Sequence, residues 1–195
     1  MAEKEFDFGD GLGPVPAHQH KNPDGTPCGW VADTAVVDIA AEIAPTAKVY
    51  GYAQVHKNAH ILGHAKVYGN TMIGEHVVIS DNAIIADEAW IDVGAHVGER
   101  AIITGHALVS GHTLVEGDAL ICENAIIHGN AHVFGKTVIA YRTLVQGNAK
   151  VGGTTQLFLD SSEPIGDNLE LLSGTKRTRN PNVVRVLQLD NDIGF

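Results

Sequence analysis

The residues best suited to chemistry are eleven histidines and two cysteines. His18, His20 and Cys28 carry metal-ligating side chains near the N-terminus, but no fourth ligand accompanies them, and a structural zinc takes four. His106 and His112 are candidate general bases, because an imidazole can accept a proton near neutral pH. Histidines exposed in turns are the alternative interpretation of both. These residues alone therefore do not specify a reaction.

A second group with binding chemistry is the basic segment near the C-terminus. Lys176, Arg177 and Arg179 lie among Ser, Thr and Gly residues in an otherwise acidic chain. Cationic side chains beside hydroxyl groups suit a phosphate or a carboxylate. We therefore predict a site for an anionic small molecule such as a nucleotide, with a solvated loop that balances the neighbouring acids as the alternative.

The elements that position these residues follow from a repeat of six residues. From Val37 to Val151, every sixth residue is a β-branched aliphatic, twenty in all. A small residue, mostly Ala, lies two positions before each of them, with Val77 as the one bulkier exception, and Gly recurs two positions after. A period of six scatters these aliphatics around an α-helix, whereas short strands separated by corners keep them all on the inside. Three strands and three corners make one coil of 18 residues.

This pattern resembles the hexapeptide-repeat, left-handed parallel β-helix superfamily. The resemblance covers residues 34–153 and implies an all-β triangular prism of about 6–7 coils, roughly 32 Å long at ~4.8 Å per coil. Residues 1–33 are then a lead segment. Residues 154–195 are a tail that caps the prism, with strands expected at 156–160 and 183–190. The segment from Trp30 to Ala35 is similar to the start of β-helix proteins of phages and bacteria.

The resemblance also implies two kinds of enzyme, and neither motif is intact. In γ-class carbonic anhydrases three histidines hold zinc between subunits; here His128 matches one position, while Glu123 and Ser110 occupy the others. Acyltransferases of this superfamily use acyl-CoA and a catalytic histidine, in a motif that His64 misses by one residue. We therefore expect no cofactor. An acyltransferase with His64, His106 or His112 as the base is the alternative, and a zinc protein is the third interpretation.

The outward-facing residues of the prism predict self-association. Two of its three faces present apolar side chains, which soluble monomers seldom leave in water. Closed rotational symmetry lets two different faces of one copy meet their counterparts on neighbours. We expect a parallel homotrimer, with cover by the lead or tail of the same chain as the alternative. The residues are Met72, Trp90, Leu108, Ile126 and Leu144 on the first face, and Ile84, Ile102, Leu120 and Val138 on the third.

A polar cluster is expected within that interface. His106, Glu123 and His128 are predicted near the edge where the first and third faces join, close to a neighbouring chain. Polar groups that converge in an apolar setting are candidates for binding a ligand.

Composition narrows the function further. A formal net charge of -10 disfavours binding to nucleic acid. No apolar run reaches the ~18 residues that a membrane-spanning helix needs, and the N-terminus lacks a signal-peptide pattern. Two distant cysteines exclude a disulfide framework, so we expect the cytoplasm of a bacterium or a phage-infected cell. We predict a non-catalytic homotrimeric β-helix that binds or displays an anionic small ligand between subunits.

Overall fold

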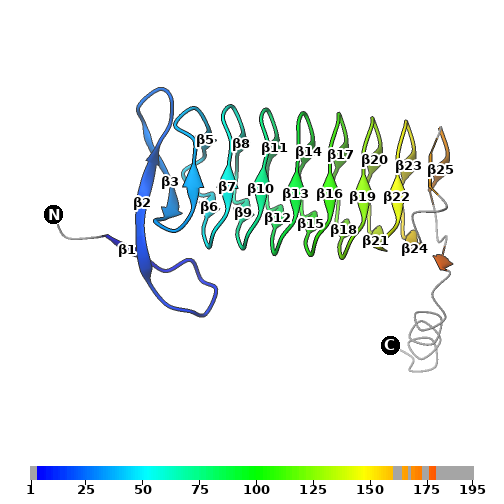
Figure 1. Ribbon diagram of the computed structural model, residues 1–195, viewed down its shortest axis with the longest axis horizontal. Helices are drawn as coiled ribbons and strands as arrows, with labels where there is room; N and C mark the ends of the chain where they lie inside the picture. Colours follow the sequence, from blue (N-terminus) through cyan, green and yellow to red (C-terminus); the bar gives the residue numbers. More distant parts are fainter. Residues whose placement is uncertain (1–3, 160–163, 167, 173–175, 179–195) are drawn as a thin grey trace.

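The protein is a long column of stacked turns in which each turn contributes one short strand to each of three sheets (Figure 1). The computed structural model describes residues 4–159, 164–166, 168–172 and 176–178. Within these ranges every regular element is a strand. The predicted all-β parallel β-helix is confirmed.

The first and second sheets are entirely parallel. Successive strands of each sheet come from successive turns, so that Met72 pairs with Trp90 and Ile73 with Ile91. The first sheet contains β4 (Val36–Val37), β7 (Gln54–Val55), β10 (Met72–Ile73), β13 (Trp90–Ile91), β16 (Leu108–Val109), β19 (Ile126–Ile127) and β22 (Leu144–Val145). The second contains β5 (Glu42–Ile43), β8 (His60–Ile61), β11 (Val78–Ile79), β14 (His96–Val97), β17 (Leu114–Val115), β20 (His132–Val133), β23 (Lys150–Val151) and β25 (Glu170–Leu171).

The third sheet is longer and begins with antiparallel strands. β1 (Glu5–Phe6) and β2 (Val15–Lys21) precede its parallel part. That part contains β3 (Pro27–Ala32), β6 (Lys48–Val49), β9 (Lys66–Val67), β12 (Ile84–Ile85), β15 (Ile102–Ile103), β18 (Leu120–Ile121), β21 (Val138–Tyr141), β24 (Gln156–Leu159) and β26 (Lys176–Thr178). The path from β3 to β26 is eight turns, because strands outside the six-residue repeat extend the column at both ends.

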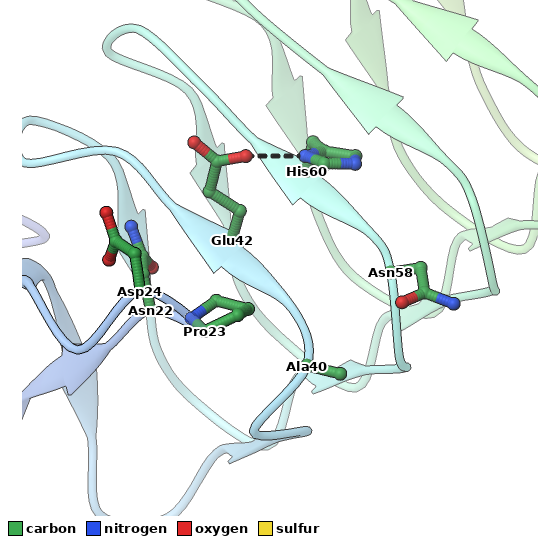
Figure 2. A pocket seen from close by; sticks show the side chains of 7 residues that line it. All are labelled: Asn22, Pro23, Asp24, Ala40, Glu42, Asn58 and His60. Carbon is green, nitrogen blue, oxygen red and sulfur yellow. Dashed lines mark hydrogen bonds and ion pairs between the residues drawn. The ribbon is translucent and has the colours of Figure 1, made fainter.

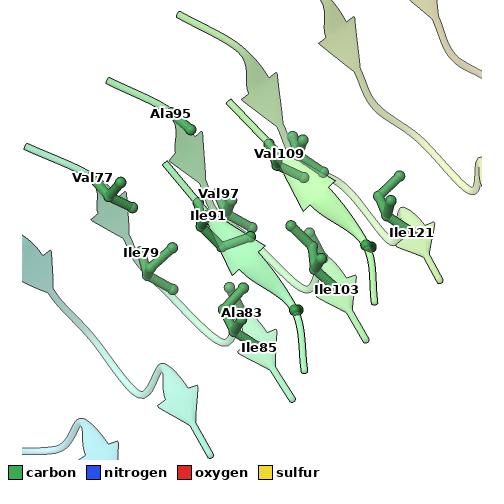
Figure 3. Packing of buried hydrophobic residues seen from close by; sticks show 14 of the residues in the cluster. Val77, Ile79, Ala83, Ile85, Ile91, Ala95, Val97, Ile103, Val109 and Ile121 are labelled. Carbon is green, nitrogen blue, oxygen red and sulfur yellow. The ribbon is translucent and has the colours of Figure 1, made fainter. Parts of the chain in front are cut away.

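The core consists of stacked layers of aliphatic side chains that point inward from all three sheets (Figure 3). Ile79, Ile85 and Ile91 are completely buried, as are most of the alanines two positions before the inward aliphatics, for example Ala83 and Ala89. The small residue leaves space near each corner, which the branched side chain of the next strand then fills. This is the arrangement that the repeat predicts.

The corners need a left-handed backbone, and two kinds of residue supply it. Gly69 has a φ of +83°, and a Cβ built there would lie 2.6 Å from the carbonyl oxygen of Asp87 in the next turn. Asp87 itself has a φ of 60°. Its Oδ2 accepts a hydrogen bond from the backbone N–H of Gly105 at 3.1 Å. Carboxylates at non-glycine corners thus tie one turn to the next, which offsets the cost of a positive φ.

The N-terminal hairpin closes the open end of the column. β2 lies antiparallel to β3. The buried His20 places Nε2 3.0 Å from the carbonyl oxygen of Ala41. Asn22 Oδ1 accepts the backbone N–H of Ile43 at 2.9 Å. Side chains of the hairpin therefore satisfy backbone groups of the first turn that have no preceding strand to pair with.

The C-terminal strands continue the column after the repeat ends. β24 occupies most of the strand expected at 156–160, while the strand expected at 183–190 lies outside the described residues. Lys150 pairs with Glu170 and Gln156 with Lys176, which is a step of 20 residues instead of 18. Sheet pairing thus persists where the six-residue register has been lost.

Candidate functional site

The outer surfaces of the first and third sheets carry the predicted apolar side chains. Trp90 on β13 is 45% exposed and Ile102 on β15 is 38% exposed. The other apolar residues at these outward positions are half-buried, namely Met72, Leu108, Ile126, Leu144, Ile84, Leu120 and Val138. These two surfaces are therefore candidates for contact with another molecule.

The N-terminal segment covers only the beginning of the third sheet. Phe6 stacks on Trp30 with ring centroids 4.5 Å apart, and Phe8 stacks on Tyr50 at 4.7 Å. Lys48 Nζ donates a hydrogen bond to the carbonyl oxygen of Phe8 at 3.0 Å. Burial raises the pKa of Tyr50 to about 12. Cover by the lead segment therefore applies to the first turns and not to the apolar stretch from β12 to β21.

The outer surface of the second sheet is mostly polar, and the three histidines that point outward from it lie on separate strands. His60, His96 and His132 belong to β8, β14 and β20, with one strand between each pair. His60 Nδ1 is 2.7 Å from Glu42, and His132 Nε2 is 2.8 Å from Glu116. Each of these two histidines is thus engaged by a carboxylate of its own.

The candidate bases His64, His106 and His112 lie on three different edges of the column. His64 follows β8, His106 follows β15 and His112 follows β16, and all three are exposed. His106 Nδ1 lies 3.0 Å from Glu88 Oε2. None of the three lines either of the clefts described below.

Only two members of the predicted polar cluster lie together. His106 and Glu123 occupy successive turns of the edge between the third and first sheets, where the backbone N–H of His106 donates to the carbonyl of Glu123 at 2.6 Å. His128 follows β19 and therefore lies at the edge between the first and second sheets. A strand separates it from Glu123, because the chain crosses the whole first face between them.

The candidate metal ligands are engaged elsewhere. His18 Nδ1 is 2.7 Å from Asp33 Oδ1. Cys28 Sγ accepts the amide of Asn22 at 3.0 Å. Burial lowers the pKa of His20. Within the described ranges, no group of three or more His, Cys, Asp or Glu side chains could hold a metal ion.

The basic segment is described only in part. Lys176 and Arg177 lie on β26, paired with Gln156 and Leu157 of β24 at the C-terminal end of the third sheet. Arg179 lies outside the described residues.

A cleft that the sequence did not predict lies between the β2–β3 loop and the second sheet (Figure 2). Its volume is about 350 Å³, and its lining combines carboxylate, imidazole, amide and apolar side chains. The residues are Asn22, Pro23, Asp24, Ala40, Glu42, Asn58 and His60. In the sequence, residues 22–25 indicate only a turn. The repeat places Glu42 and His60 on one column, but nothing in it shows that the turn lies beside them.

A second, shallower cleft of about 320 Å³ lies beside the first strand of the first sheet. It is lined by His18, Gln19, His20, Lys21, Val37 and Ile39. The side chain of Ile39 is 79% exposed. This cleft offers fewer acceptor groups than the first.

Comparison with known proteins adds no family assignment. No model of a known protein family matches the chain, and no curated protein is significantly similar to it. In the part of the chain that the structure describes, no helix has the length and apolar character required to cross a membrane.

Proposed function

We propose that this protein is a non-catalytic, homotrimeric β-helix of the left-handed hexapeptide type, which serves as a scaffold that binds or displays a ligand. The observation that supports this most directly is the pair of apolar surfaces on the first and third sheets. Trp90 and Ile102 remain exposed there although the chain has folded. Two differently oriented apolar surfaces on one column suit a closed ring of copies, because each copy then contacts two neighbours.

The absence of a shared site for the candidate bases also favours a scaffold. His64, His106 and His112 lie on different edges, so no two of them can act together on one substrate within a single chain. A general base must be held within hydrogen-bond reach of the proton that it removes. Glu88 contacts His106 and could orient its imidazole, but both side chains are more than half exposed. An acyltransferase thus gains no support from an enclosed site around these histidines.

The ligand of this proposal is an anionic small molecule bound near the C-terminal end. Its support is the run of Lys176, Arg177 and Arg179, the first two of which lie on β26. In a trimer this segment occurs three times. Titration calorimetry with ATP and with acetyl-CoA tests the idea, and turnover of acetyl-CoA would favour the acyltransferase instead.

The trimer is tested with a double substitution on the first sheet. Leu108→Asp with Ile126→Asp places two carboxylates on the proposed interface, and light scattering after size exclusion measures the mass. The wild type is expected at three times 20.7 kDa, and the variant as monomer or aggregate, because a buried unpaired charge is costly.

A matched control uses the second sheet. Leu114 is an outward, half-buried leucine on β17, the strand that follows Leu108 in the same turn. Leu114→Asp should leave the mass unchanged. A double variant that still has the wild-type mass, or a control that dissociates equally, contradicts the assignment of the interface.

A further inference from the structure

The cleft beside the N-terminal hairpin has one wall that is fixed in place. Asn22 uses both ends of its side-chain amide, since Nδ2 donates to Cys28 Sγ at 3.0 Å and Oδ1 accepts the backbone N–H of Ile43 at 2.9 Å. The loop is thereby tied to β3 on one side and to β5 on the other. Because the loop is already held in place, ligand binding costs little conformational entropy there.

Among the described residues, one oxygen of each carboxylate in the cleft has no hydrogen bond or ion pair to the protein. Glu42 Oε2 lies 2.7 Å from His60 Nδ1, whereas Oε1 has no such partner there. Asp24 Oδ1 accepts two hydrogen bonds from Thr26, at 2.9 and 2.7 Å, and these leave Oδ2 unused. The hydrogen bonds from Thr26 lower the pKa of Asp24 below its ordinary value.

The rest of the lining is compatible with an aliphatic chain that ends in a donor group. Pro23 and Ala40 provide apolar contact, and the amide of Asn58 is available as a further acceptor (Figure 2). The seven lining residues include neither lysine nor arginine, and the one imidazole among them, His60, contacts Glu42 through Oε2, which leaves Glu42 Oε1 and Asp24 to meet a cation. The lining therefore combines apolar surface for a stem with negative charge for its end.

We propose that this cleft binds the side chain of an arginine, with the guanidinium between Asp24 and Glu42 and the aliphatic stem along Pro23 and Ala40. A guanidinium presents five donors in a planar fork that matches carboxylate oxygens, whereas an ammonium is a compact point charge. The formal net charge of -10 favours the approach of a cation. The cleft lies within one chain, so the proposal does not depend on the trimer.

Isothermal titration calorimetry at low ionic strength tests the site with N-acetyl-L-arginine amide. The comparison ligand is N-acetyl-L-citrulline amide, which has the same shape and no charge. We expect saturable binding of the arginine compound, at least about tenfold tighter than the citrulline compound, and weakening as NaCl screens the carboxylates. A tripeptide, Gly-Arg-Gly, then distinguishes a peptide-borne arginine from the free amino-acid derivative by whether its affinity is retained.

The variants Glu42→Gln and Asp24→Asn should each weaken binding at least about fivefold. Glu116→Gln is the matched control, because Glu116 forms the same kind of pair with His132 on the same sheet, at 2.8 Å, but does not line this cleft. Its affinity should match the wild type. Thermal melts of all three variants establish that they are folded.

Three results would overturn the proposal. The first is no saturable binding of the arginine compound up to about 20 mM. The second is equal binding of the citrulline compound, which assigns the affinity to shape alone. The third is equal weakening by Glu42→Gln and Glu116→Gln, which assigns it to the overall charge of the chain.

Discussion

Interior threonines provide a test in which one substitution has opposite effects at different sites. Thr71 and Thr113 replace the usual alanine at the small interior position, and their buried hydroxyl groups have no hydrogen-bond partner among the described residues. Thr143 also lies inside the column, but its Oγ1 donates to the carbonyl of Ala140 at 2.7 Å and accepts the N–H of Leu159 at 2.8 Å. The same residue type is therefore unsatisfied at two sites and doubly bonded at the third.

The expected magnitudes follow from these contacts. A buried polar group without a partner costs about 1–3 kcal/mol, so Thr71→Val and Thr113→Val should each stabilise the fold by about 1 kcal/mol. Val77 occupies the equivalent interior position elsewhere and is fully buried, which shows that a valine fits there. Thr143→Val should instead cost about 2–3 kcal/mol, because it leaves the buried N–H of Leu159 without its acceptor.

Equilibrium unfolding in urea measures these differences as shifts of the midpoint at constant m value. Thr71 and Thr113 precede strands of different sheets, so the double variant should show nearly additive gains. If Thr71→Val destabilises the protein as much as Thr143→Val, the interior does not penalise a lone hydroxyl and the reasoning is refuted.

Two further predictions concern pH and the corners. Because burial lowers the pKa of His20, the unfolded chain binds more protons than the folded one as the pH falls below about 6.5. The stability that neutral His20 contributes is complete above that pH and is lost as the pH falls through the depressed pKa. His20→Gln keeps an N–H donor for the carbonyl oxygen of Ala41 and should reduce the dependence of the urea midpoint on pH. An unchanged dependence contradicts His20 as its origin. Gly117→Ala should cost about 1–3 kcal/mol, since φ is +76° and the new Cβ would lie 2.5 Å from the nitrogen of Gly135. Glu123→Gly, at a φ of 59°, should be close to neutral, and equal losses in the two melts would count against the steric explanation.

The sequence was sufficient to predict the column because its core is encoded locally. Each inward aliphatic, such as Ile85, and each interior alanine, such as Ala83, has the same neighbours one turn away, so one six-residue rule determines every layer. The corners follow the same rule, with Gly69 and Asp87 as two solutions to one backbone requirement. The repeat was therefore enough to predict the stacked column.

The ends of the column could not be predicted in this way. The N-terminal hairpin is held by single contacts between a side chain and a distant backbone group, such as His20 with Ala41 and Asn22 with Ile43. These contacts have no period and involve residue types that are common in turns. At the other end, pairing of Lys150 with Glu170 needs two extra residues in the turn, which breaks the pattern that would reveal the strand.

The placement of His128 illustrates a second limit. Two residues that flank one short strand are only five positions apart in sequence, yet the strand between them spans a whole face. Glu123 therefore lies on one edge and His128 on the next. Clusters inferred from such a repeat are reliable along an edge, where the step is 18 residues, and not across a face.

Regularity also determines where a ligand site can form. Along a regular edge, a polar side chain can meet a neighbour one turn away, as where Asn130 donates to Asn148 at 3.1 Å. Such side chains use their hydrogen-bonding groups on one another. The cleft with unsatisfied carboxylate oxygens occurs where the hairpin loop departs from the repeat and lies against β5. Binding by this protein is therefore expected at the irregular ends of the column, and its uniform faces are better suited to contact with further copies of the chain.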